Sequence, residues 1–457
     1  MSSPNSDVVS LENPPQEALQ GISELYSQGR LNEALDKTDE LVGKFPNSAN
    51  LNNIQGVLNK TLGRLDEALI SFRRAVMLEP AYAKAYSNMG NVYKEKGRLE
   101  EAEASYRKAI ELDPDYAEGH NNLGNTLNEV GKIAEAEASF RQALALKPGF
   151  AEAHINLGDV LIKLHRLDEA EASCRHAIAL TPDSAEAYNN LGNTLQEMGR
   201  LEEPEANFRQ AIALKPDYAE AYSNLASMLK QFGSYEKAEE NYRQAIALNP
   251  GYAEAYMNLG SSLTEVGRLE EGEASHRRAI ALNPDFAEAN YNLGNILQDL
   301  GQFEEALVSY KKAMSLNPDL VDVHSNLGNT LQELNLFEEA EESYRKAISL
   351  QPDDFKAYNN LGIALKELGR FGEAELCYRQ AIFLNPAFVE AHFNLGNTLL
   401  KLGKLKESEA KLRHTIILNP NFVEAHVNLG NTLKKFNRFK EADASYRQAI
   451  VLDPNYN

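Results

Sequence analysis

Prolines recur every 34 residues along this chain, and no insertion or deletion breaks the count. They stand at Pro46, Pro80, Pro114, Pro148, Pro182, Pro216, Pro250, Pro284, Pro318, Pro352, Pro386, Pro420 and Pro454. A fixed period of a few tens of residues is typical of a solenoid, in which each repeat buries its apolar face only against its neighbours. The sequence therefore predicts one long stacked array of thirteen repeats.

We number each repeat so that its proline occupies repeat position 32. The array then fills residues 15–457, and the repeats start at residues 15, 49, 83, 117, 151, 185, 219, 253, 287, 321, 355, 389 and 423. Residues 1–14 precede the array and are rich in Ser, Asn and Pro. We expect them to form a short flexible tail.

Turn residues divide each repeat into two helices. Position 15 is Gly in ten repeats, Asn in two (Asn335, Asn437) and His in one (His165). These residue types tolerate the left-handed conformation that closes a helix. The glycine and the proline act as stop signals, so the sequence predicts helix A over positions 2–14 and helix B over positions 17–30. Apolar residues three and four apart form one stripe on each helix.

Glycine also occupies position 8 in most repeats, inside the predicted helix A. Such a glycine costs about 1 kcal/mol of helix propensity, so we expect helices A and B to pack closely there. Ile22 and Ala226 replace it in the first and seventh repeats. Pro204 falls in the first turn of a helix B, where backbone N–H groups have no intrahelical partner, and we expect it to bend that helix little.

With Gly at position 8, Ala at 20, an aromatic residue at 24, Ala at 27 and Pro at 32, the unit resembles the tetratricopeptide repeat. The resemblance covers essentially all of residues 15–457. It implies an all-α, right-handed superhelical solenoid of helix-turn-helix repeats, in which helix A lines a concave groove.

The sequence offers no pattern of catalytic, cofactor-binding or metal-binding residues. It lacks the zinc-protease, P-loop and nucleophile-elbow motifs. Five of the nine histidines share repeat position 4, where other repeats carry Tyr, so we expect them to pack in the core; they are His120, His154, His324, His392 and His426. Cys174 and Cys377 lie far apart in the sequence, and we interpret both as packing residues. The chain is therefore predicted not to be an enzyme and to hold no cofactor.

Charge is distributed unevenly. The net charge is −21; residues 117–354 hold 39 acids against 19 bases, whereas residues 355–456 carry a net charge of +4. Such an acidic array disfavours nucleic acid and anionic membranes, because phosphate binding needs a basic surface. No apolar run is long enough to span a membrane. We predict a cytoplasmic protein without nucleic-acid or membrane partners.

A row of asparagines is the candidate binding site. Asparagine occupies position 6 in eleven consecutive repeats, at Asn88, Asn122, Asn156, Asn190, Asn224, Asn258, Asn292, Asn326, Asn360, Asn394 and Asn428. Positions 2, 6, 9 and 13 share one helical stripe, which is mostly acidic at 2, often Asn at 9 and often acidic at 13. An amide offers a donor and an acceptor, so the row can pair with the backbone of an extended peptide.

Two interpretations of this row stay open on the sequence alone. The asparagines bind a neutral or basic polypeptide, or they bond within the array as a recurring feature of duplicated repeats. The row is similar to the asparagine ladder in the tetratricopeptide region of O-linked N-acetylglucosamine transferase, which implies capture of substrates and partners along a groove. A clamp for a C-terminal carboxylate is disfavoured, because positions 2, 5 and 6 are not basic.

Three classes of function follow. We predict foremost a non-catalytic scaffold for protein interaction; the alternative is the substrate-recruiting arm of a larger transferase, and an enzyme in its own right is remote. The last helix B ends with the usual apolar pattern, including Tyr446 and Ile450, and no capping helix follows it. End-to-end self-association through this repeat is therefore also expected.

Overall fold

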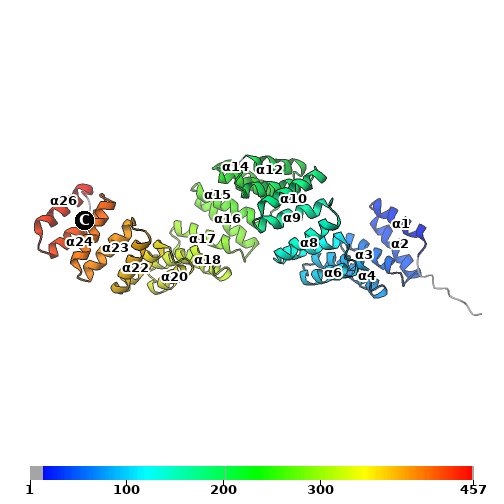
Figure 1. Ribbon diagram of the computed structural model, residues 1–457, viewed down its shortest axis with the longest axis horizontal. Coiled ribbons are helices and arrows are strands. Elements are labelled where there is room, and N and C mark those ends of the chain that lie inside the picture. The colour runs from blue at the N-terminus through cyan, green and yellow to red at the C-terminus, as the bar shows by residue number, and fades with distance from the viewer. Residues whose placement is uncertain (1–13, 201, 455–457) are drawn as a thin grey trace, which may run out of the picture. The chain divides into compact units, whose positions relative to one another are not determined.

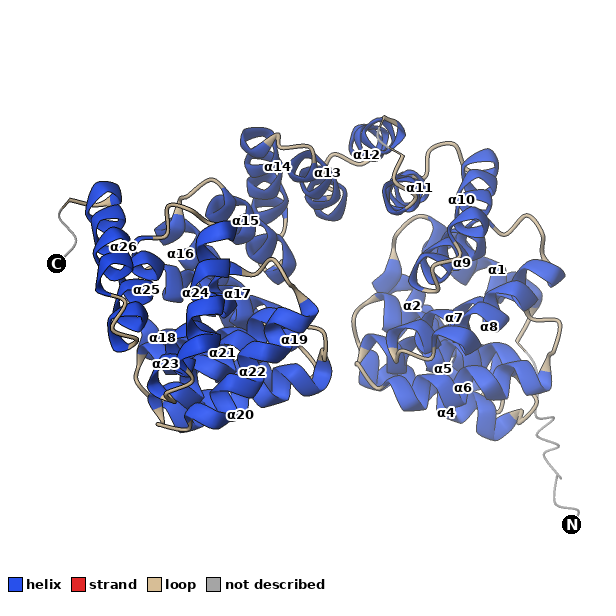
Figure 2. Ribbon diagram, turned by 60° about the vertical axis from the view of Figure 1, so that its left-hand side comes forward, coloured by secondary structure: helices blue, strands red, loops and turns tan. Residues whose placement is uncertain are grey.

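The computed structural model of the protein describes residues 14–200 and 202–454. These residues form helices and turns and contain no strand (Figure 2). The helices follow one another in helix-turn-helix pairs, each pair occupying one 34-residue repeat (Figure 1). The prediction of an all-α tetratricopeptide solenoid is thus confirmed, while the predicted flexible tail lies almost entirely outside the described residues.

Within each repeat the odd-numbered helix is helix A and the even-numbered helix is helix B. The helices A are α1 (Gln16–Ser27), α3 (Ala49–Thr61), α5 (Ala83–Glu95), α7 (Ala117–Glu129), α9 (Ala151–Lys163), α11 (Ala185–Glu197), α13 (Ala219–Gln231), α15 (Ala253–Glu265), α17 (Ala287–Asp299), α19 (Val321–Glu333), α21 (Phe355–Glu367), α23 (Val389–Lys401) and α25 (Val423–Lys435). The helices B are α2 (Leu31–Lys44), α4 (Leu65–Leu78), α6 (Leu99–Leu112), α8 (Ile133–Leu146), α10 (Leu167–Leu180), α12 (Glu203–Leu214), α14 (Tyr235–Leu248), α16 (Leu269–Leu282), α18 (Phe303–Leu316), α20 (Phe337–Leu350), α22 (Phe371–Leu384), α24 (Leu405–Leu418) and α26 (Phe439–Leu452).

The chain packs as two compact units, an N-terminal unit of residues 1–228 and a C-terminal unit of residues 229–457. Within each unit, helix A packs on helix B of its own repeat and on the preceding helix B. Successive helices A, such as α5 and α7 or α19 and α21, also pack on one another, which makes helix A the inner layer. That all thirteen repeats form one uninterrupted array stays a prediction.

The turns between helices A and B are as the sequence predicted. All ten glycines at position 15 have a positive φ, and so do His165 (55°), Asn335 (58°) and Asn437 (60°). Most helices A, however, occupy positions 1–13 rather than the predicted 2–14, as in α5. The position-14 residue is the C-cap, whose backbone N–H still bonds to the last turn, as that of Lys96 does to the Val92 carbonyl.

The glycine at position 8 makes room for the large side chain at position 24 of the same repeat. A Cβ atom built on Gly90 would lie 2.6 Å from the Tyr106 ring, and one on Gly124 would lie 2.6 Å from the Phe140 ring. Both rings are fully buried between their two helices. The predicted close packing is therefore confirmed, and it is a side chain of helix B that fills the space.

Proline 204 changes its helix more than the sequence suggested. Helix B was expected over residues 201–214, but α12 begins at Glu203 with the proline in its first turn. Proline has no N–H to donate and fixes its own φ, which suits the first turn of a helix. Leu201, the first residue of the expected helix, lies outside the described residues.

Candidate functional site

The eleven asparagines of repeat position 6 lie where the sequence placed them, one on each helix A from α5 to α25, and each is half-buried. Because successive helices A contact one another within a unit, their shared face is the inner face of that unit. Each unit therefore carries its own asparagine row.

The side-chain amides of ten of these asparagines donate a hydrogen bond to the preceding repeat. The acceptors are the Oδ1 atoms of Asn53, Asn91, Asn121, Asn189, Asn295, Asn329, Asn359 and Asn397, the backbone carbonyl of Ile155, and Ser261 Oγ. The donor–acceptor distances run from 2.8 Å for Asn428 to 3.4 Å for Asn122. The row thus joins neighbouring repeats, as the structural interpretation of the sequence expected.

A tyrosine of helix B shares the acceptor in three of these contacts. The Tyr344 hydroxyl donates to Asn329 Oδ1 over 2.8 Å, and the same oxygen accepts from Asn360 at 3.0 Å. Tyr106 and Tyr310 repeat this arrangement. Where position 24 is Phe140, which has no hydroxyl, the following asparagine bonds to Asn121 at position 5 instead.

The Asn190 contact fixes which way one amide points. Its acceptor is the Ile155 backbone carbonyl, 3.3 Å away, so the NH2 group must face the preceding repeat. The Oδ1 atom then points away from that repeat. Among the described residues, the Oδ1 atoms of Asn360 and Asn428 accept hydrogen bonds. No Oδ1 atom of the row is both buried and without a hydrogen-bond partner. Each unit therefore presents accessible acceptors along its inner face.

Charged side chains flank the row at position 13, the last residue of helix A. In the C-terminal unit Asp299 and Glu333 are exposed and make no ion pair with another described residue. Acids at a helix C-terminus face the negative end of the helix dipole. Lys401 and Lys435 occupy the same position in later repeats. The inner face of this unit thus changes sign along its length.

The histidines at position 4 have a structural role. Each donates a hydrogen bond from Nε2 to the backbone carbonyl of a position-32 proline, as His392 does to Pro386 over 2.9 Å. Burial lowers the pKa of His154 and of His392. The described residues contain no group of three or more side chains that could hold a metal ion.

Both cysteines are free thiols that serve as packing residues. Cys174 is fully buried, and its Sγ atom lies 2.8 Å from where a Cβ would stand on Gly158. Burial raises the pKa of the Cys174 thiol to about 12 and that of Cys377 to about 11. Neither thiol is therefore a nucleophile at neutral pH.

Sequence reasoning missed a network of ion pairs on the opposite side of the repeats. Glu341 at position 21 of α20 binds Arg345 on its own helix at 2.7 Å and Arg370 of the next repeat at 2.6 Å. Arg345 and Arg370 also reach Glu373, at 3.7 and 2.6 Å. At six further junctions the glutamate at position 21 likewise binds a basic residue on its own helix and another in the next repeat. These glutamates are Glu103, Glu137, Glu171, Glu239, Glu375 and Glu409. The recurrence of Glu at position 21 with Arg or Lys at 16 and Arg at 25 was the available signal.

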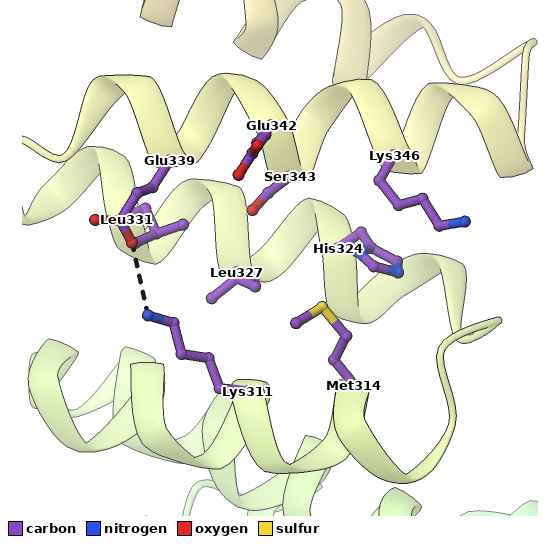
Figure 3. A pocket seen from close by; sticks show the side chains of 9 residues that line it. All are labelled: Lys311, Met314, His324, Leu327, Leu331, Glu339, Glu342, Ser343 and Lys346. Atoms are coloured by element: carbon purple, nitrogen blue, oxygen red, sulfur yellow. Dashed lines mark ion pairs between the residues drawn. The ribbon is translucent and has the colours of Figure 1, made fainter.

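Shallow grooves lie between neighbouring helices B on the outer layer. In the groove between α18 and α20, Met314, Leu327 and Leu331 form the floor, and Lys311 and Glu339 pair across it at 3.6 Å (Figure 3). Two further grooves of the C-terminal unit have the same repeat positions on their walls. These grooves therefore recur with the repeat.

Comparisons with known families identify tetratricopeptide repeats along the chain. Residues 16–257 match the model described as "Cilia and flagella-associated protein 70 C-terminal domain". Tetratricopeptide-repeat models match residues 260–301, 294–335, 321–354, 343–375, 364–403 and 423–456. The resemblance to O-linked N-acetylglucosamine transferase is not shown. A search of curated protein sequences gave no match.

One solved structure supports the fold. The crystal structure of the APC/C hetero-tetramer Cut9-Hcn1 contains a chain that is 14% identical, with a TM-score of 0.50; the match covers 96% of this chain and 94% of that chain. A structure of the MamA protein is 23% identical and matches 37% of this chain and 93% of that chain, with a TM-score of 0.36. Among the described residues, no helix combines the length and apolarity that a membrane crossing demands.

Proposed function

For a chain that belongs to the tetratricopeptide-repeat proteins and, over residues 16–257, to the Cilia and flagella-associated protein 70 C-terminal-domain family, we propose a non-catalytic scaffold that binds extended polypeptide. The ligand lies along the asparagine row on the inner face of each unit. We place this activity in the cytoplasm. The cilium in the family's description refers to the protein after which the family is named.

The direction of the amides carries the proposal. Their NH2 groups are used between repeats, whereas most of their Oδ1 atoms have no partner among the described residues. The row therefore offers acceptors, and its ligand has to supply donors. A polypeptide supplies backbone N–H groups at regular intervals, and Lys or Arg side chains add charged donors. The unpaired acids Asp299 and Glu333 favour such basic residues.

The repeat spacing suits an extended ligand. Packed helix layers lie about 10 Å apart, and an extended chain advances about 3.3 Å per residue. One asparagine therefore meets roughly every third residue of the peptide. Since a neutral hydrogen bond contributes about 1 kcal/mol net, we expect affinity to fall about fivefold for each contact that is removed.

The test uses a synthetic 20-residue peptide of Gly, Ser and Lys and a copy of it that is N-methylated at every third residue. Fluorescence anisotropy with the full chain should show that methylation weakens binding strongly, because it removes N–H donors and leaves the carbonyls intact. Replacement of Asn326, Asn360 and Asn394 by Ala should weaken binding in steps. The control is Asn241→Ala, a half-buried asparagine of α14 that bonds to its own helix. Equal affinity for both peptides would contradict the proposal.

A further inference from the structure

Large apolar side chains are exposed on the outer layer of the last three repeats. Phe383, Ile417 and Val451, which we call the outer stripe, are 77%, 72% and 73% exposed. They occupy repeat position 29 on the consecutive helices α22, α24 and α26. Leu376, seven residues before Phe383 on the same face of α22, is 67% exposed. Exposed apolar groups in a row are typical of an interaction surface.

The three helices are neighbours, so the stripe is continuous. Arg379 of α22 reaches Glu407 of α24 at 2.5 Å, and Arg413 of α24 reaches Glu441 of α26 at 3.4 Å. Between α24 and α26 runs a groove whose lining includes Ile417 of the stripe. The stripe thus presents three apolar side chains at intervals of one repeat.

Basic residues accompany the stripe. Lys406 of α24 and Lys440 of α26 lie eleven residues before Ile417 and Val451, which is the same side of each helix. Both lysines are exposed, and neither forms an ion pair with another described residue, whereas Glu407 and Glu441 beside them are paired. The outer stripe is therefore a positively charged apolar surface.

The N-terminal unit presents the complementary surface at the same repeat positions. Position 29 of α8, α10 and α12 is occupied by exposed alanines, Ala145, Ala179 and Ala213. Eleven residues before the last two stand the exposed acids Asp168 and Glu202. Residues 117–218 hold 16 acids against nine bases. Large apolar groups with lysines on α24 and α26 thus correspond to small groups with acids on α10 and α12.

We propose that the outer stripe of one copy docks on the alanine surface of α8, α10 and α12 of a second copy. Because both surfaces have the same 34-residue period, three side chains and three sites engage at once. The contact joins different surfaces of the two copies, so each chain keeps one surface of each kind free for a further copy. This inference does not depend on the asparagine row.

Sedimentation velocity of the full chain over a range of concentrations tests the proposal. Self-association should rise with concentration and weaken in high salt, because charge contributes to it. Replacing Phe383, Ile417 and Val451 by Ala, the residue that α8, α10 and α12 carry there, should weaken it at least tenfold. Ile70→Ala with Met77→Ala is the control, because these two exposed residues occupy positions 22 and 29 of the single helix α4.

Charge exchange supplies the second arm of the experiment. Lys406→Glu with Lys440→Glu should weaken association, and a second chain carrying Asp168→Lys with Glu202→Lys should restore it when the two variants are mixed. A strict monomer at the highest concentration, or association that the triple alanine variant leaves unchanged, would overturn the proposal. So would a monomeric chain that uses the stripe to capture an acidic helical partner.

Discussion

At the scale of single residues, the side chain at position 9 decides whether the buried tyrosine at position 24 has a hydrogen-bond partner. Where it is Tyr344, the hydroxyl is bonded to Asn329. Tyr378 has the same burial, but Ile363 stands at position 9, and the Tyr378 hydroxyl has no hydrogen-bond partner. A buried hydroxyl without a partner costs free energy that a bonded one does not.

Tyrosine-to-phenylalanine substitutions should therefore have different effects in adjacent repeats. We expect Tyr344→Phe to lower the free energy of unfolding by about 1 kcal/mol, because a buried hydrogen bond is lost. Tyr378→Phe should leave it unchanged or raise it. Urea denaturation followed by circular dichroism measures both, and equal losses in the two variants would show that the Tyr378 hydroxyl is bonded in solution.

Histidine 276, at repeat position 24, makes a pH-dependent contribution to the free energy of unfolding. Burial lowers its pKa from 6.5 to about 4, and neither ring nitrogen has a partner. The folded state keeps this histidine neutral, whereas the unfolded chain binds a proton below pH 6.5. Its contribution is therefore present above pH 6.5 and is lost as the pH falls toward 4.

Between pH 7 and pH 5 we expect the free energy of unfolding of the wild-type chain to fall by about 2 kcal/mol because of His276. His276→Phe removes the titrating group and places a ring like that of Phe208 against Gly260. The difference between the two unfolding free energies should change with pH over this interval. A constant difference from pH 7 to pH 5 would mean that His276 titrates normally in the fold.

At the scale of helices, the glycine at position 8 sets the distance between helices A and B. The ring that fills this space belongs to the partner helix and sits between both backbones, so it has no room to move away. Gly372, in the first turn of α22, has no heavy atom within 4 Å of its would-be Cβ. The glycine at position 8 is therefore required by packing, whereas Gly372 is not.

Alanine substitutions distinguish them. Gly124→Ala should destabilise the protein by about 1–3 kcal/mol, because the new methyl group meets the Phe140 ring. Gly372→Ala should be neutral or stabilise by up to about 1 kcal/mol through helix propensity. Thermal unfolding measures both, and a tolerated Gly124→Ala would show that helices A and B can separate without loss.

At the scale of the whole molecule, each repeat contacts its neighbours and few others, so stability is a sum of local terms. The ion pairs of Glu341 and its counterparts join adjacent repeats and do not extend further. A disturbance in one repeat should therefore remain local. This distinguishes a solenoid from a globular domain with a single core.

Hydrogen exchange of Gly328→Ala should reveal this locality. The substitution meets the Tyr344 ring at 2.6 Å, and we expect faster exchange in α17–α22 of the C-terminal unit. Helices α3–α8 of the N-terminal unit should keep wild-type protection. Faster exchange in both regions would indicate global rather than local unfolding.

The sequence by itself determined the repeat boundaries, the helix pairs and the turns. A 34-residue period, left-handed turn residues and apolar spacing act within one repeat, so they can be read without knowing its neighbours. The asparagine row could be located in the same way. Only the tertiary structure decided that most of its NH2 groups bond to the preceding repeat, because the acceptor depends on which side chains that repeat carries at positions 5, 9 and 24. The ion pairs between repeats and the outer stripe likewise depend on how neighbouring helices B are placed, which no single repeat encodes.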